Sequence, residues 1–308
     1  MSLGVLNNIS ALYAENNLNQ TQSSLQNTLT QLSSGSRINS GADDAAGLSL
    51  ANGLDANSAA LTQSSENASE GVGLLQVADG ALSQVTNLLN RAVTLATEAS
   101  NGTLNATQDS AANSEYQSIL DEISNIGATS TYNGQQVFGG AAPSSFAVFT
   151  GDGTKGGGFS DTISLGALSS AAVGDATGSA GLTYTSGAGA ATSTLTYAPV
   201  VADAENLSTT DLNNSANAQT ALNDVYTAVQ DVAAERGYTG AQINTLNAVS
   251  NVASTEQENV VSAENAVTAT DYGAATSDLS KYEILTQTGI SALSQANSTE
   301  QEVTKLLQ

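Results

Sequence analysis

Proline is absent from two long stretches of the chain, residues 1–142 and 200–308. The two prolines, Pro143 and Pro199, border one middle segment. This segment and its edges also hold all four phenylalanines and, between Gly139 and Gly189, 13 of the 28 glycines. Proline breaks helices, and glycine-rich stretches favour turns and short strands. The sequence therefore predicts helix, then sheet, then helix, with the two helical ends free to pair with each other.

Apolar residues recur in steps of three and four in both flanks. The first flank carries Leu75, Ala78, Leu82, Val85, Leu89, Ala92 and Ala96, and the last third carries Ala218, Leu222, Val225, Val229 and Val232. This spacing places the residues on one seam of a helix, as in a coiled coil, although an ordinary amphipathic bundle has a similar pattern. We predict a mainly α fold: a long antiparallel coiled-coil-like helical bundle formed by the N- and C-terminal segments, with a small β-hairpin-rich outer module inserted in the middle.

The two extreme ends are poor in apolar surface. Residues 1–42 hold one acid, Glu15, and one base, Arg37, and both ends carry sparse apolar side chains at helical spacing. Those that we assign to packing are Leu25, Leu29 and Leu32 near the start and Leu293, Val303 and Leu307 near the end. Isolated helices are marginal in water. We therefore predict that partners order these ends; packing on the protein's own core is the alternative.

Short runs of alternating residues predict hairpins in the middle segment. Four such runs are marked by Phe146 with Val148, Ile163 with Leu165, Leu182 with Tyr184, and Leu195 with Tyr197. We expect the last two runs to pair across a turn rich in glycine and alanine, with Leu182 and Tyr184 opposite Leu195 and Tyr197. The result is a small sheet module with a weak core.

Composition excludes several classes of function. The chain has 29 acidic and 6 basic residues, a net charge of −23, and no Cys, His or Trp. Histidine-dependent nucleophiles and Cys/His zinc sites cannot form, and the negative charge repels nucleic acid. A glycosidase that uses only carboxylates stays chemically open, but nothing marks one acid pair as catalytic. We predict a protein that is not an enzyme, needs no cofactor and binds no nucleic acid.

Two local motifs have structural interpretations. The doublet Asp43-Asp44 is expected to cap a helix that starts at about Ala45, because no further ligand stands at a metal-like spacing. The glycine-rich run 151–158 lacks the ordered signature of a phosphate loop and is predicted to be a turn. The first basic residue is Arg37 and no apolar run reaches membrane-spanning length, so we expect neither a cleavable secretory signal nor membrane insertion.

The run from Leu32 to Leu48, LSSGSRINSGADDAAGL, closely resembles the signature of bacterial flagellin. The likeness continues at 78–82, 89–95, 99–103 and 131–134, and resumes at 258–263, 271–272 and 279–285. It covers roughly residues 1–140 and 205–308 and leaves the middle unmatched. Several motifs in order at both ends make the resemblance specific.

The resemblance implies a domain plan and a function. Residues 1–42 with 266–308 would form a terminal helical filament-core domain, residues 43–165 with 205–265 a helical rod domain with a β-hairpin, and residues 166–204 a small variable, surface-exposed β module. The packing residues assigned to the rod are Leu75, Leu82, Val85, Leu89, Val225 and Val229. The chain would be exported by the flagellar type III system and would polymerise outside the cell into the flagellar filament for swimming motility.

The resemblance also implies partners. These are further copies of the chain, sister flagellins, a flagellar export chaperone, the filament cap and the hook-associated proteins. Arg91, Leu95 and Glu115 match the patch that the innate flagellin receptor contacts, although Ala92–Thr94 lacks the charge typical of receptor-activating members. The alternative is that Leu95 belongs to the helix seam and Arg91 offsets nearby acids.

Two alternative functions stay open. A hook–filament junction protein shares the terminal pattern, although the Asp43-Asp44 and Thr131–Gly134 segments favour the filament subunit. A surface adhesin or polysaccharide-binding homologue would use the aromatic residues Tyr184 and Tyr197 of the middle module.

Basic residues common in the family are absent at several places, such as the C-terminal Gln308. Because like charges repel, filament stability should depend on salt and pH.

Overall fold

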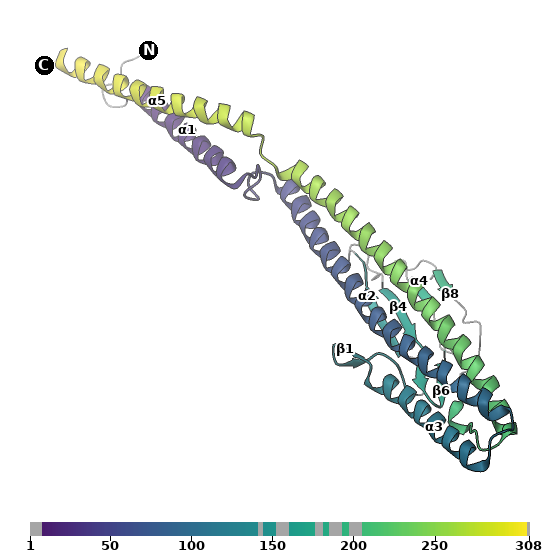
Figure 1. The fold of residues 1–308 in the computed structure, drawn as a ribbon. Coiled ribbons are helices and arrows are strands. Elements are labelled where there is room, and N and C mark those ends of the chain that lie inside the picture. Colours follow the sequence, from purple (N-terminus) through teal and green to yellow (C-terminus); the bar gives the residue numbers. More distant parts are fainter. Residues whose placement is uncertain are drawn as a thin grey trace. The chain divides into compact units, whose positions relative to one another are not determined.

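The computed structural model describes residues 8–140, 144–151, 160–175, 181–184, 193–196 and 205–306 (Figure 1). Its α-helices are α1 (Ile9–Ser34), α2 (Ala45–Ser100), α3 (Ala106–Thr129), α4 (Ser215–Thr268) and α5 (Tyr272–Leu306). The strands lie between α3 and α4, as the proline and glycine distribution predicts. The predicted mainly α fold, with long N- and C-terminal helices that pack together and a small strand-containing middle region, is confirmed.

The chain forms two compact units. Met1–Ala56 and Val260–Gln308 make up one, which we call the terminal unit, and Asn57–Asn259 make up the other, the central unit. In the terminal unit α1 packs against α5, and in the central unit α2 and α4 run side by side (Figure 1). The sequence-based boundaries of the three domains remain predictions.

Helices α2 and α4 are antiparallel in the central unit. The Gln257 side chain donates to the Thr62 hydroxyl at 2.9 Å, and the hydroxyls of Ser65 and Ser250 are 2.8 Å apart. Further along, Arg236 Nε donates to Asp79 at 2.8 Å. Along these contacts the residue numbers fall on α4 as they rise on α2. The predicted antiparallel arrangement is therefore confirmed for this pair of helices.

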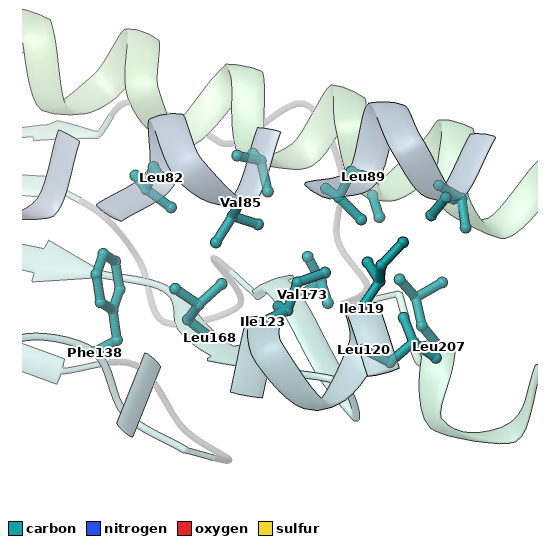
Figure 2. Packing of buried hydrophobic residues seen from close by; sticks show 14 of the residues in the cluster. Leu82, Val85, Leu89, Ile119, Leu120, Ile123, Phe138, Leu168, Val173 and Leu207 are labelled. Atoms are coloured by element: carbon teal, nitrogen blue, oxygen red, sulfur yellow. The ribbon is translucent and has the colours of Figure 1, made fainter. Parts of the chain in front are cut away.

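The core of the central unit joins α2, α3 and α4 with the first strands. Leu82, Val85 and Leu89 of α2 face Ile119 and Ile123 of α3, as Figure 2 shows. Leu168 and Val173, which we assigned by sequence to the outer module, are buried in the same cluster. These two residues therefore add to the core of the helical rod, which a short β module could not build alone.

The strands form four antiparallel two-stranded sheets among the described residues. They are β1 (Thr131–Tyr132) with β2 (Gln135–Gln136), β3 (Ser144–Phe149) with β4 (Ser160–Leu165), β5 (Ala167–Ser169) with β6 (Ala172–Asp175), and β7 (Gly181–Tyr184) with β8 (Ser193–Thr196). The turn between β1 and β2 has Asn133 at φ 49° and Gly134 at φ 76°, the positive angles of a type I′ hairpin.

The predicted register of the last hairpin is partly wrong. Leu182 pairs with Leu195 as expected, but Tyr184 pairs with Ser193. In an antiparallel ladder a step forward on one strand is a step backward on the other. Two tyrosines that both follow the paired leucines therefore cannot face each other. Tyr197 lies outside the described residues, as does most of the glycine-rich run 151–158.

The acidic doublet before α2 has two separate roles. Asp44 caps the helix, since its carboxylate accepts the N–H of Gly47 at 2.9 Å and α2 begins at Ala45. Asp43 instead closes the preceding turn by accepting N–H bonds from Asn39 and Ser40, and these bonds lower its pKa. The predicted capping role is confirmed for Asp44 and wrong for Asp43.

Candidate functional site

The terminal unit is held together by a polar pairing of two helices. The Asn8 side chain donates to the Ala296 carbonyl at 3.0 Å, while Leu18 lies against Gly289. A side chain at Gly289 would press on Leu18, so glycine allows this close approach. Among the described residues of the unit, the buried apolar side chains are Ile38, Ala51 and Ala275. The pair therefore holds little of the apolar burial that stabilises a fold.

Large apolar side chains remain uncovered on both helices of the pair. Ile9 and Tyr13 of α1 are 62 % and 68 % exposed, and Ile284 of α5 is 63 % exposed. Others in the terminal unit that are exposed by more than a third are Leu12, Leu29, Leu50, Val261, Tyr272, Leu285 and Ile290. Monomeric proteins rarely leave so much apolar side chain uncovered on one element, so this surface is suited to contact with other chains.

Several threonine hydroxyls on these two helices are hydrogen-bonded within their own helix. The hydroxyls of Thr21, Thr28 and Thr30 in α1 donate to the carbonyls four residues earlier, and Thr286 and Thr288 in α5 do the same. A hydroxyl that is satisfied within its own helix can be buried without a lost partner. These threonines therefore do not prevent the helix faces that carry them from being covered.

Four of the predicted filament-packing residues lie on described parts of the two helices, with different exposures. Leu25 and Leu32 of α1 and Leu293 of α5 are half-buried, and Leu29 is exposed. Val303 and Leu307 lie outside the residues whose side chains are described. The sequence reasoning missed Ile9, Tyr13, Ile284 and Ile290. They could have been found by searching the two terminal segments for large apolar residues that lie off the predicted helical seam.

A short clasp closes the terminal unit beside the acidic doublet. The Arg37 N–H donates to the Thr268 carbonyl at 2.7 Å, and its guanidinium donates to the Val267 carbonyl at 2.9 Å. The guanidinium thus meets the carbonyl end of α4, where a positive charge is favourable. The Thr270 N–H in turn donates to the Gly35 carbonyl at 3.1 Å. The clasp fixes the loop that follows α1 against the chain that precedes α5.

The predicted rod-packing residues lie inside the central unit. Leu75, Leu82, Val85, Leu89 and Val225 are fully buried, and Val229 is partly buried against the same cluster. Leu95 is also buried, with 3 % of its surface exposed, which agrees with the alternative that it belongs to the helix seam. Its side chain is not available to a receptor on this face.

Arg91 and Glu115 form an exposed ion pair between α2 and α3. The guanidinium Nε and Nη2 both lie 2.7 Å from Glu115 Oε1. The hydrogen bond with Glu115 raises the pKa of Arg91, and the same bond lowers the pKa of Glu115. Of the three residues predicted for the receptor patch, the surface of the central unit presents these two.

The described part of the chain contains no group of three or more His, Cys, Asp or Glu side chains placed to hold a metal ion. Within the same residues, no helix is long and apolar enough to cross a membrane.

Comparison with known proteins identifies the family. Residues 5–142 match the family described as bacterial flagellin N-terminal helical region, and residues 222–307 match the bacterial flagellin C-terminal helical region. Flagellin of Listeria monocytogenes is 31 % identical over 302 residues, which are 97 % of this chain and 98 % of that protein. Flagellin 1 of Proteus mirabilis is 40 % identical over 133 residues, 43 % of this chain and 36 % of that one. The match to the crystal structure of Bacillus cereus flagellin covers 61 % of this chain and 88 % of the chain in that structure, at 26 % identity and a TM-score of 0.44.

A helical unit made from both chain ends, with apolar side chains left uncovered, is typical of a protein that associates with other chains. The matches at both ends of the sequence say which kind of associating protein this is. The chain belongs to the bacterial flagellin family, and it is a structural subunit of the flagellar filament. Self-assembly and a place outside the cell in the filament follow from the family.

Proposed function

We propose that copies of the chain join through the uncovered apolar side chains of α1 and α5 in the terminal unit. The observation that carries the proposal is the exposure of Ile9, Tyr13, Ile284 and Ile290 on helices that bury few apolar residues between them. Full burial of one such side chain contributes about 1.5–3 kcal/mol, whereas association costs roughly 4–15 kcal/mol in lost freedom. Several of these side chains must therefore be covered together, on both helices, for a lasting contact.

Assembly also completes the fold of the terminal unit. A pair of helices with a small apolar interface has a low free energy of unfolding. Contacts with neighbouring copies stabilise the pair, because they bind the folded form and not the unfolded one. A contact between different faces of successive copies does not close on itself, so it propagates into a filament. The residues assigned to this layer are Leu25, Leu29, Leu32, Leu293, Val303 and Leu307.

The same exposed surface calls for partners before and at the ends of assembly. An apolar helical surface that is uncovered in the monomer has to be covered during transport to avoid aggregation. A flagellar export chaperone supplies this cover, the type III channel carries the chain out, and the filament cap and hook-associated proteins occupy the two ends of the polymer. Sister flagellins that share the terminal helices can join the same filament.

The experiment replaces two apolar side chains of α5 and measures the length and yield of the filaments. The double variant Ile284→Asn with Ile290→Asn should leave the circular dichroism of the monomer nearly unchanged, because both side chains are exposed. It should reduce filament length and yield sharply in electron microscopy and sedimentation. Val252→Asn is the matched control, since Val252 is 65 % exposed on α4 in the central unit. Normal filaments from the double variant, or equal damage from the control, would overturn the proposal.

Recognition by the innate flagellin receptor would use the ion pair of Arg91 and Glu115. The pair is exposed and held in one geometry by a 2.7 Å contact, so it offers a receptor a fixed pair of charges. Arg91→Ala should lower receptor signalling, whereas Asp121→Asn, an exposed charge change on α3, should leave it unchanged. Equal signalling from the Arg91 variant would remove this part of the proposal.

A further inference from the structure

Asparagine is followed directly by glycine at three positions of the chain, Asn52, Asn101 and Asn133. In such a pair the main-chain nitrogen of the glycine can attack the side-chain carbonyl carbon of the asparagine, because glycine has no Cβ atom to hinder the approach. The attack needs a backbone that brings the two atoms together and a glycine N–H that is not firmly hydrogen-bonded. The structure places the three pairs in three different settings.

The pair at Asn52 lies inside helix α2. Its side chain is exposed, but the nitrogen of Gly53 belongs to the helix, where each N–H donates to the carbonyl four residues earlier. The ψ angle of an α-helix, about −42°, also holds the side chain out of the plane in which a ring with the next nitrogen would close. This part of α2 must therefore open before the pair can react.

The pair at Asn133 forms the exposed turn between β1 and β2. Asn133 has a φ angle of 49°, in the left-handed region whose ψ angle is about +47°. In an L-residue with this ψ angle, the Cβ atom and the nitrogen of the next residue stand on opposite sides of the Cα–C bond. The turn therefore has to unwind before Gly134 can reach the side chain of Asn133.

The pair at Asn101 follows the last residue of α2, and both of its residues are exposed. The Gly102 N–H donates to the Ala99 carbonyl at 3.5 Å, the outer limit of a hydrogen bond, so it is weakly held. Among the described residues, Asn133 is the only one besides glycines with a positive φ angle, so Asn101 is free of that obstacle.

A hydrogen bond turns the side chain of Asn101 toward the reacting nitrogen. Its Nδ2 atom donates to the hydroxyl of Thr103 at 3.1 Å. Thr103 comes directly after Gly102, so the amide group of Asn101 is directed forward along the chain, past the nitrogen of Gly102. Thr103 thus acts as a positioning residue for this pair.

We propose that Asn101 is a site of spontaneous deamidation. The Gly102 nitrogen gives its proton to solvent and forms a bond to Cγ of Asn101, and the side-chain nitrogen takes up a proton and leaves as ammonia. Water then opens the succinimide ring at either of its two carbonyl carbons. One product is aspartate, and the other is isoaspartate, in which the main chain runs through Cβ. Either route consumes one water molecule and releases one ammonia, so no further reactant is needed.

The modification changes the turn that leaves α2. Both products place a negative charge at the carbonyl end of this helix, where negative charge is unfavourable. The Ser215 hydroxyl of α4 donates to the Ser100 carbonyl at 2.8 Å, and a Cβ atom at Gly102 would lie 3.7 Å from the same hydroxyl oxygen. Isoaspartate lengthens the main chain by one carbon atom beside this contact. The contact between the end of α2 and the start of α4 should therefore weaken.

Peptide mass spectrometry of the full-length monomer, incubated in mildly alkaline buffer, measures conversion at the three pairs in one sample. Asn101 should convert at least about tenfold faster than Asn52, a factor that corresponds to about 1.4 kcal/mol for opening the helix. It should also convert faster than Asn133. The same chain in concentrated urea is the control: all three pairs should then convert at similar rates, because glycine follows each asparagine.

Variants of Thr103 test the positioning of the side chain. Thr103→Val removes the acceptor and should slow conversion at Asn101 about fivefold, as expected for the loss of one hydrogen bond, without changing conversion at Asn133. Thr103→Ser keeps the hydroxyl and should restore the rate. A change in general stability would alter all three pairs and would not be reversed by serine.

Several outcomes would overturn the proposal. Conversion at Asn101 that is no faster than at Asn52 in the folded chain would show that the turn does not promote the reaction. Faster conversion at Asn133 than at Asn101 would show that the left-handed turn is no obstacle. Equal rates at Asn101 in the parent and in Thr103→Val would show that the hydrogen bond does not position the side chain.

Discussion

The phenol of Tyr116 donates a hydrogen bond to the hydroxyl oxygen of Thr210, with the two oxygens 2.6 Å apart. The direction follows from the rest of the site, because the Thr210 hydroxyl proton is already used in a 2.7 Å bond to the Leu207 carbonyl. Both side chains are buried. A chain of two hydrogen bonds therefore links α3 to the 3₁₀ turn η1 (Leu207–Thr209), which precedes α4 in the chain.

Removing the Tyr116 hydroxyl and removing the Thr210 hydroxyl should have unequal effects on stability. Tyr116→Phe loses one hydrogen bond and leaves the Thr210 hydroxyl bonded to Leu207, so it should cost about 1 kcal/mol. Thr210→Val leaves the buried phenol without an acceptor and should cost more, about 1–3 kcal/mol beyond the shape change. Urea denaturation of both monomers gives the two free energies of unfolding. A larger loss for Tyr116→Phe would show that the donor assignment is wrong.

Gly127 lies where α3 packs closely against β5. A methyl group at this position would collide with the carbonyl oxygen of Leu168. Gly127→Ala should therefore destabilise the central unit by about 1–3 kcal/mol, even though alanine favours helix.

The matched control for Gly127 is Gly80, an exposed helical glycine of α2. A methyl group there meets nothing within 4 Å. Gly80→Ala should raise the free energy of unfolding by up to about 1 kcal/mol, the difference in helix propensity. Thermal and urea denaturation of the two variants should thus shift in opposite directions. Shifts of the same sign would contradict the packing argument.

The helical part of the fold could be predicted from the sequence because helical periodicity is a local property. Leu82, Val85 and Leu89 recur in steps of three and four, and the structure buries all three. The absence of proline limited the strands to the middle segment for the same local reason. Leu182 opposite Leu195 was also predictable, whereas the facing tyrosines were not consistent with antiparallel pairing.

The burial of Asp231 could not be predicted from the sequence. Asp231 stands among 29 acidic residues, and nothing in its neighbourhood along the chain marks it as buried. Its burial arises where segments distant in the sequence pack against α4 in the folded chain. The exposure of Ile284 has a similar origin, because it depends on which face of α5 meets α1. The spacing of residues along the sequence does not predict which side chains from distant segments will surround a given residue.

The helix cap at Asp44 gives a prediction for the start of α2. Asp44→Ala removes the acceptor for the Gly47 N–H and should cost about 1 kcal/mol. Asp44→Asn keeps an acceptor oxygen at the same place and should retain most of the stability. The measurement is amide exchange of Gly47 and Leu48, which reports on the first turn alone. Equal exchange in the parent and the alanine variant would mean that the cap does not hold this turn.

Filament stability should rise with ionic strength. The central unit, residues 57–259, carries 19 acidic and three basic residues, a net charge of −16, so neighbouring copies repel. Screening shortens the range of this repulsion from roughly 30 Å at 0.01 M to roughly 10 Å at 0.1 M. The temperature at which filaments dissociate, followed by light scattering, should therefore increase over this range and then level off. If screening is the cause, sodium chloride and sodium perchlorate should raise the dissociation temperature equally, because the repulsion depends on ionic strength alone. If the salts acted instead through the hydration of apolar surface, the two would have different effects, and at higher concentration. Filaments that dissociate at one temperature at both ionic strengths would show that the charges of neighbouring copies do not oppose assembly.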